Sequence, residues 1–158
     1  MNQMSQKDGL HPLIDPPTEE ERATWPKRHI FDMPSMHGDT RGDMVPVFDG
    51  LMKSCVLIRS VPGAVRANHY HKTDWHYCYL LEGACAYIYR PVGSTETPTV
   101  EYAVAGQCIF TPPMLEHTMV FTKPSSMITL GRNLRIQDVY EADIMRHAPL
   151  EKLVTITY

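Results

Sequence analysis

The residues best suited to chemistry are four histidines. Three of them, His69, His71 and His76, lie within eight positions of the stretch NHYHKTDWH, and a fourth, His117, follows the double proline of TPPMLEH. The chain has 8 histidines in 158 residues, so a window of that size would hold about 0.4 of a histidine on composition alone. Neutral imidazoles are ligands for Zn, Fe, Mn, Ni or Cu. We therefore expect these four side chains to hold one divalent metal ion, with a metal-free use as the alternative.

Strand geometry explains how the histidines could converge. Residues i and i+2 of a strand face the same way, so His69 and His71 should project together from one face. Residues 72–75 form a short polar loop and His76 begins the next apolar run, so a hairpin would return it beside the first pair. His117 begins a further strand, HTMVF. Neighbouring strands can thus supply one site.

Charged residues near the histidines are candidates for substrate contacts and proton transfer. Arg66 and Arg59 could grip a phosphate or carboxylate through two parallel hydrogen bonds, and the alternative is a pair of exposed solubilising charges. Asp74 and Glu116 flank histidines in the sequence, and either could accept an imidazole N–H. The predicted catalytic set is His71, Arg66 and Glu116.

Tyrosines beside the histidines are further candidates for a base. Alternate residues from His76 onward should share the inner face of their strand, which places Tyr77 and Tyr79 outside. The following strand should send Tyr87 to one side and Ile88 to the other. Sheet packing is therefore the expected role of most of these aromatic side chains.

Short β-rich segments separated by turn-forming residues make up most of the chain from residue 45 onward. They are residues 45–49, 53–61, 75–81, 84–90, 99–104, 107–111, 117–122 and 126–131. Strands of this length and spacing predict an all-β sandwich or barrel. A single helical turn is expected over residues 139–146, and VTITY at residues 154–158 has the pattern of a strand.

Two motifs resemble those of the cupin superfamily. The stretch GAVRANHYHKTDWHYCYLLEG, residues 63–83, matches G-x5-H-x-H-x4-E-x6-G at every spacing, with His76 where that family usually has glutamate. The stretch AGQCIFTPPMLEH, residues 105–117, resembles the second motif, G-x5-P-x-G-x2-H-x3-N, with Met114 and Phe121 in place of the glycine and the asparagine.

The cupin resemblance covers about residues 46–135 and implies a double-stranded β-helix, the small jelly-roll barrel, with the histidines lining its mouth. An imidazole in place of a carboxylate makes a divalent metal site one charge unit more positive. Such a site favours anionic or enolisable oxygen ligands. Four protein ligands on an octahedral metal leave two positions open for substrate.

Three stretches are similar to the nucleotide-sugar branch of the cupins. HGDTRGDMVPVF, residues 37–48, is similar to the D-x-R-G opening of sugar-nucleotide epimerases and ketoisomerases. RANHYHK, residues 66–72, and VYEADIMR, residues 139–146, resemble the R-G-x-H-A-H-K stretch and the Y-x-x-x-D-Y-I-R ending of dTDP-4-keto-6-deoxyglucose 3,4-ketoisomerases. The resemblance implies an isomerase or epimerase of a keto nucleotide sugar. Those ketoisomerases usually have glutamine at the position of His76, and their paired histidines shuttle protons without a metal.

Other functions remain open at this point, because cupins host many activities on one fold. All-histidine sites also occur among cupin oxygenases, so a metal-dependent dioxygenase of a small enol or diketone is the first alternative. The second is a non-catalytic small-molecule-binding cupin.

The chain is expected to form a single cupin barrel domain over residues 28–158, preceded by an N-terminal arm over residues 1–27. The arm has four prolines and an acidic run without a sustained apolar period. It is therefore either disordered or docked, through Leu13, Ile14 and Trp25, on the domain or on a second subunit. Small cupins usually pair, so a homodimer is expected.

Composition excludes several function classes. The net charge of −3 and the lack of a basic stripe argue against nucleic acid as a partner. No signal peptide and no run of about 18 apolar residues is visible, so a cytoplasmic location without membrane insertion is expected. The four cysteines lie in apolar stretches without a C-x-x-C pair, which indicates buried thiols.

Overall fold

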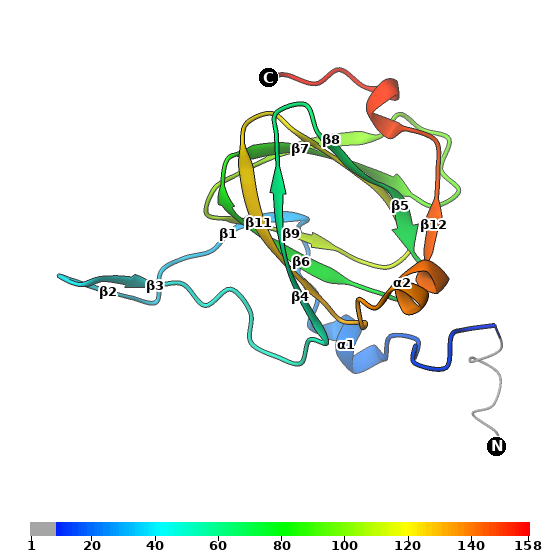
Figure 1. Ribbon diagram of the computed structural model, residues 1–158, viewed down its shortest axis with the longest axis horizontal. Helices are drawn as coiled ribbons and strands as arrows, with labels where there is room; N and C mark the ends of the chain where they lie inside the picture. The colour runs from blue at the N-terminus through cyan, green and yellow to red at the C-terminus, as the bar shows by residue number, and fades with distance from the viewer. Residues whose placement is uncertain (1–8) are drawn as a thin grey trace.

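The described residues form twelve strands, and ten of them build a barrel (Figure 1). The computed structural model describes residues 9–158. One sheet contains, in spatial order, β1 (Ile30–Asp32), β9 (Gln107–Thr111), β6 (His76–Glu82), β11 (Ser125–Gly131) and β4 (Ser54–Ser60). The other contains β12 (Ile144–Arg146), β5 (Val65–His71), β10 (Leu115–Phe121), β7 (Ala84–Pro91) and β8 (Thr99–Val104). All pairs are antiparallel, and the predicted all-β jelly-roll barrel is confirmed.

The hydrophobic core lies between the two sheets and follows from strand alternation. β6 turns Cys78 and Leu80 inward, and β7 turns Cys85 and Tyr87 toward them. The intervening residue of β7, Ile88, packs on the outer face of its sheet instead. This split between inner and outer residues is the one that a period of two predicts.

Segments at both ends of the chain cover the outer faces of the barrel. Outside the first sheet, Trp75, Tyr77 and Phe110 pack against Trp25 and further partly buried residues, which are Phe31, Met33, Phe48 and Met52. Outside the second sheet, a short 3-10 helix, η1 (Leu150–Leu153), inserts the fully buried Leu150. Each sheet is therefore buried on both faces over part of its area.

The N-terminal segment from residue 9 to residue 27 lies on the barrel. Its short helix α1 (Glu19–Ala23) begins with a capping box, in which Thr18 and Glu21 satisfy each other's backbone N–H groups. Ile14 is 1% exposed, and the rings of Trp25 and Trp75 lie 6.1 Å apart. Leu13, expected to dock as well, remains 49% exposed. Residues 1–8 of the expected arm fall outside the described residues.

Three segments differ from their predicted structures. Residues 45–49 form no strand, because Pro46 lacks the N–H that strand pairing requires. Residues 154–158 form none either, and Val154 and Ile156 pack on the outer face of the second sheet. The predicted helical turn is the helix α2 (Gln137–Asp143), which is followed at once by β12.

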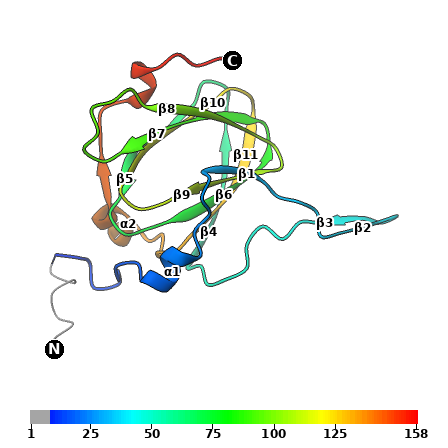
Figure 2. The same cartoon turned by 180° about the vertical axis from the view of Figure 1, so that it is seen from behind.

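A hairpin of β2 (His37–Asp39) and β3 (Gly42–Met44) projects away from the barrel in both views (Figure 1, Figure 2). All its strand residues are exposed, and it forms a separate two-stranded sheet. Within residues 9–158, no helix is long and apolar enough to cross a membrane.

Candidate active site

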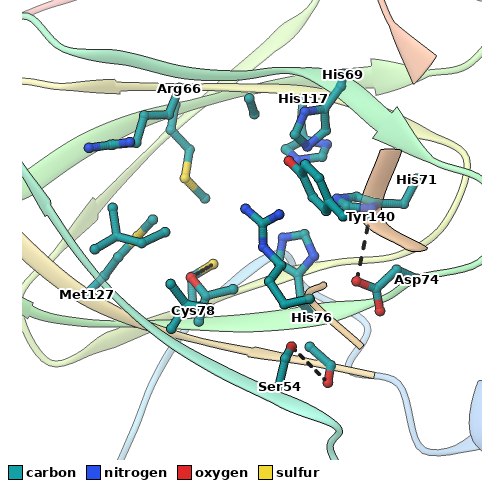
Figure 3. A pocket seen from close by; sticks show the side chains of 17 residues that line it. Ser54, Arg66, His69, His71, Asp74, His76, Cys78, His117, Met127 and Tyr140 are labelled. Carbon is teal, nitrogen blue, oxygen red and sulfur yellow. Dashed lines mark hydrogen bonds and ion pairs between the residues drawn. The ribbon is translucent and has the colours of Figure 1, made fainter. Parts of the chain in front are cut away.

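A cavity of about 180 Å³ opens between the two sheets of the barrel (Figure 3). All four predicted histidines line it. Its opposite wall is apolar and is formed by Val56, Ile58, Met119 and Met127. Further polar side chains reach it, among them Arg66, Arg135 and Tyr140. The barrel therefore combines a cluster of imidazoles with an apolar wall in one small chamber.

The histidines meet because three strands bring them together. His69 and His71 lie on β5, and His117 on β10 is the direct cross-strand partner of His69. The ring centroids of His69 lie 4.8 Å from His71 and 5.0 Å from His117, and those of His71 and His76 lie 5.1 Å apart. The i, i+2 argument therefore places His69 and His71 correctly, but the predicted hairpin is wrong: β5 pairs with β10 and β12, and β6 pairs with β9 and β11. Residues 72–75 cross from one sheet to the other, so His76 meets the first pair from the opposite sheet.

A β-bulge in β5 adds Arg66 to the same cavity. Ala67 and Asn68 both have positive φ angles, of 71° and 55°, and the register with β10 shifts at this point. In a regular strand, Arg66 would face away from His69 and His71. The extra residue turns the side chains of both Arg66 and Ala67 toward the cavity.

Hydrogen bonds orient two of the imidazoles. Nδ1 of His71 lies 3.2 Å from a carboxylate oxygen of Asp143, and Nδ1 of His117 lies 3.0 Å from the carbonyl oxygen of Leu115. Both partners are acceptors, so each Nδ1 carries the proton and donates it. The Nε2 atoms of both rings are left with free lone pairs.

Burial keeps three of the histidines, His69, His76 and His117, neutral. Desolvation, followed by the charges of neighbouring imidazoles, lowers the pKa of His69 to about 2 and that of His117 to about 3. The same causes hold the pKa of His76 well below its usual value. Burial raises the pKa of Asp143, but hydrogen bonds from His71 and Thr73 outweigh it and the net shift is downward. Asp143 is therefore a carboxylate at pH 7.

Three residues of the site come from a segment to which the sequence analysis assigned no site residue. Asp143 orients His71, Tyr140 lies with its ring 6.0 Å from those of His69 and His71, and Arg135 stacks 3.4 Å above the Tyr140 ring. The signal was present in VYEADIMR, which contains both Tyr140 and Asp143. The likeness of this motif to other sequences does not by itself assign a role to either residue.

Glu116 does not reach the cavity, contrary to its prediction as a catalytic residue. It neighbours His117 on β10, and strand alternation turns it to the outer face, where its carboxylate accepts a hydrogen bond of 2.7 Å from Arg90. Arg59 is likewise absent from the cavity wall among the described residues, and its carbonyl oxygen accepts a hydrogen bond from Arg66. The Tyr87 hydroxyl is buried against Thr111.

The donor set fits a divalent metal ion in its chemistry. The potential ligand atoms of His69, His71 and His117 all lie within 4.8 Å of one another, as do those of His71, Asp74 and His76. Neutral rings with a free Nε2 are the form that binds metal. His69 and His76 belong to different groups, so the described residues form two overlapping triads rather than one group of four histidines.

Comparison with known proteins gives matches in structure but not in sequence. No protein-family model matches the chain, and no curated protein is significantly similar to it. A sugar 3,4-ketoisomerase from Thermoanaerobacterium thermosaccharolyticum in complex with TDP has a TM-score of 0.59 at 17% identity, covering 75% of this chain and 86% of that chain. A variant of that enzyme has been solved with TDP-4-keto-6-deoxyglucose.

Two further structures represent related activities. A double mutant of a 3'-monoepimerase from Streptomyces bikiniensis in complex with dTDP has a TM-score of 0.65 at 16% identity, covering 82% of this chain and 74% of that chain. A dTDP-4-dehydrorhamnose 3,5-epimerase from Sulfolobus tokodaii has a TM-score of 0.60 at 15% identity, covering 80% of this chain and 79% of that chain. The protein therefore has the cupin fold of nucleotide-sugar ketoisomerases and epimerases.

Proposed function

We propose that the protein is an enzyme that isomerises or epimerises a keto sugar carried on a nucleotide diphosphate. The observation that carries this proposal is the pair of His71 and Asp143, which presents a free Nε2 lone pair to the cavity beside Tyr140. The activities named for the structural neighbours support it. Isomerisation and epimerisation both begin with removal of a proton next to a carbonyl group.

His71 is the proposed base. Its Nε2 accepts the proton from the carbon beside the sugar carbonyl, and the electron pair of that C–H bond forms an enediolate. The Asp143 carboxylate holds the ring in the required tautomer and stabilises the imidazolium that forms, as a carboxylate does for the histidine of a catalytic triad. The imidazolium exchanges its proton with solvent and delivers a proton to the adjacent carbon, while the hydroxyl proton of the enediolate passes to the former carbonyl oxygen, and these two transfers complete an isomerisation.

Tyr140 is the proposed proton donor. Burial raises the pKa of its phenol, an effect that the charge of Arg135 partly opposes, so the hydroxyl is protonated at neutral pH. The group lies at the same cavity as His71. A donor there can protonate or hydrogen-bond the developing enediolate oxygen.

The cavity suits only the sugar part of such a substrate. Its volume of about 180 Å³ is below the roughly 300 to 1,000 Å³ of sites for drug-sized ligands, so the nucleotide must lie outside. Arg66 and the exposed Arg135 offer guanidinium groups to the diphosphate. The wall of Met119 and Met127 would contact an apolar group, which favours a deoxy sugar with a methyl group.

A divalent metal on His69, His71 and His117 is a second candidate, favoured by the short spacing of their ligand atoms. Bound there, a Zn, Fe, Mn or Ni ion would act as a Lewis acid toward a substrate oxygen. The Nε2 lone pair of His71 cannot bind a metal and accept a proton at once. The metal content of the purified protein therefore decides between these two uses of His71.

Deuterium incorporation tests the proposal. Wild-type protein incubated in D2O with TDP-4-keto-6-deoxyglucose should place deuterium at the carbon beside the carbonyl, as observed by NMR. His71→Asn should abolish the exchange, while the matched control His37→Asn, on the exposed strand β2, should retain it. No exchange by wild-type protein, together with O2 consumption on an enol or diketone, would establish the dioxygenase instead. If neither deuterium exchange nor O2 consumption is observed, a non-catalytic binding protein is favoured.

A further inference from the structure

Arg132 joins the N-terminal arm to the barrel. Its guanidinium is buried and contacts the Glu21 carboxylate twice, at 2.8 Å and 3.2 Å. It also donates to the carbonyl oxygens of Asp15 and Pro16. Four bonds thus connect one side chain at the end of β11 to a segment more than 100 residues away in the sequence.

The contacts of Arg132 continue into the barrel through Asn133. Nη1 of Arg132 donates to Oδ1 of Asn133 at 3.0 Å. The Asn133 side chain in turn donates to the Thr73 hydroxyl at 3.0 Å, and its backbone N–H donates to Asp74 at 2.8 Å. All four residues are buried. The buried polar groups named here therefore bond to one another.

The network ends on the catalytic pair. The backbone N–H of Thr73 donates to Asp143 at 2.9 Å, its hydroxyl donates to the same oxygen, and the backbone N–H of Asp74 donates to the second oxygen at 3.1 Å. That second oxygen also accepts a hydrogen bond from the Nδ1–H of His71. An unbroken series of hydrogen bonds therefore runs from Glu21 in the arm to the imidazole of His71.

We propose that the docked arm positions the catalytic base: Glu21, Arg132 and Asn133 are positioning residues that hold Thr73 and Asp143 where they orient His71. This inference rests on the proposed function for its effect on turnover. The physical reason is that a buried, fully bonded network has one arrangement, whereas the loss of one member leaves its neighbours unpaired and free to shift. A displacement of about 1 Å at a catalytic group can cost about 100-fold in rate.

If the contacts of Arg132 with the arm were purely structural, they would stabilise the protein without affecting His71. Glu21→Ala distinguishes the two roles: a structural role predicts a change in stability alone, and a positioning role predicts a change at His71 as well. This variant removes both contacts to Arg132. The control Glu19→Ala also removes a carboxylate from α1, but that carboxylate is exposed and its ion pair with Arg22 is long at 3.9 Å. Glu21→Gln keeps an acceptor oxygen and should restore most of the wild-type behaviour.

The experiment compares the three variants in the full chain treated with a chelator. Imidazole 15N NMR reports the His71 tautomer, and the fluorescence of Trp25 and Trp75, the two tryptophans of the chain, reports folding and arm docking. We expect Glu21→Ala to lose the pure Nδ1–H tautomer of His71 and to lower kcat about tenfold or more, with KM changed less than about twofold. Glu19→Ala should behave as wild type.

A folded Glu21→Ala protein whose His71 signals and kcat equal those of Glu19→Ala would overturn the proposal. If Glu21→Ala does not fold, Arg132→Lys serves instead, since it keeps the buried charge but loses the planar fork. The NMR comparison needs no substrate. Absence of deuterium exchange in wild-type protein would therefore disprove the proposed function while the His71 signals still decide the positioning role.

Discussion

Acidification should destabilise this protein strongly, because its core contains histidines that are held neutral. Burial lowers the pKa of His69 to about 2 and that of His117 to about 3, whereas an unfolded chain would bind those protons near pH 6.5. Below pH 6.5 the unfolded state therefore binds more protons than the folded state. The free energy of unfolding must fall as the pH falls, and it must keep falling until the folded-state pKa values are reached.

The magnitude follows from the linkage relation. Each such histidine lowers the free energy of unfolding by about 1.4 kcal/mol per pH unit below 6.5, or about 2 kcal/mol at pH 5. His69 and His117 together amount to about 4 kcal/mol, a large part of the roughly 5 to 15 kcal/mol that stabilises a typical domain. Asp74 acts in the opposite sense, since burial raises its pKa and its protonation favours the fold at low pH.

Urea unfolding at pH 7.5 and pH 5.0, with chelator present, measures the effect. His117→Gln should reduce the difference between the two pH values by about 2 kcal/mol relative to wild type, and this comparison cancels the contribution of Asp74. The control Thr111→Val alters a buried polar residue that does not titrate, so it should keep the wild-type difference. An unchanged difference in His117→Gln would refute the account of a neutral buried imidazole.

Three further predictions concern the bulge, the metal and the hairpin. Ala67 has a φ of 71°, at which glycine is unstrained. Ala67→Gly should therefore raise the free energy of unfolding, measured by urea denaturation, by up to about 1 kcal/mol. A decrease of that size would contradict the claim that the backbone is strained at Ala67. Elemental analysis should find one divalent ion per chain and near none in His71→Ala, if the metal candidate is correct; equal content in both would exclude these ligands. An isolated hairpin is marginally stable, so β2 and β3 should pack on a second copy of the chain. Light scattering should then give twice the 18.0 kDa chain mass, and deletion of residues 36–44 should give monomers. A monomeric wild-type protein would contradict this prediction.

Local patterns determined the barrel and the histidine cluster. Inward and outward residues alternate along a strand with a period of two, so the sequence alone predicted that His69 and His71 share a face and that Tyr77 lies outside. The prediction that His76 returns to them is correct in its outcome but wrong in its route, because β6 lies in the other sheet and is no hairpin partner of β5. Where this periodicity ran without interruption, as in β6 and β7, the prediction agrees with the structure.

Tertiary structure decided the rest of the site. Arg66 enters the cavity only because two residues with positive φ form a bulge, which a regular alternation does not predict. The outward position of Glu116, by contrast, follows from alternation alone, because its neighbour His117 takes the inner face of β10. Asp143 reaches His71 across 72 residues, and Glu21 reaches Arg132 across 111, through chain crossings that no local pattern encodes. The sequence by itself thus determined which histidines converge, whereas only the packing of distant segments decided what orients them.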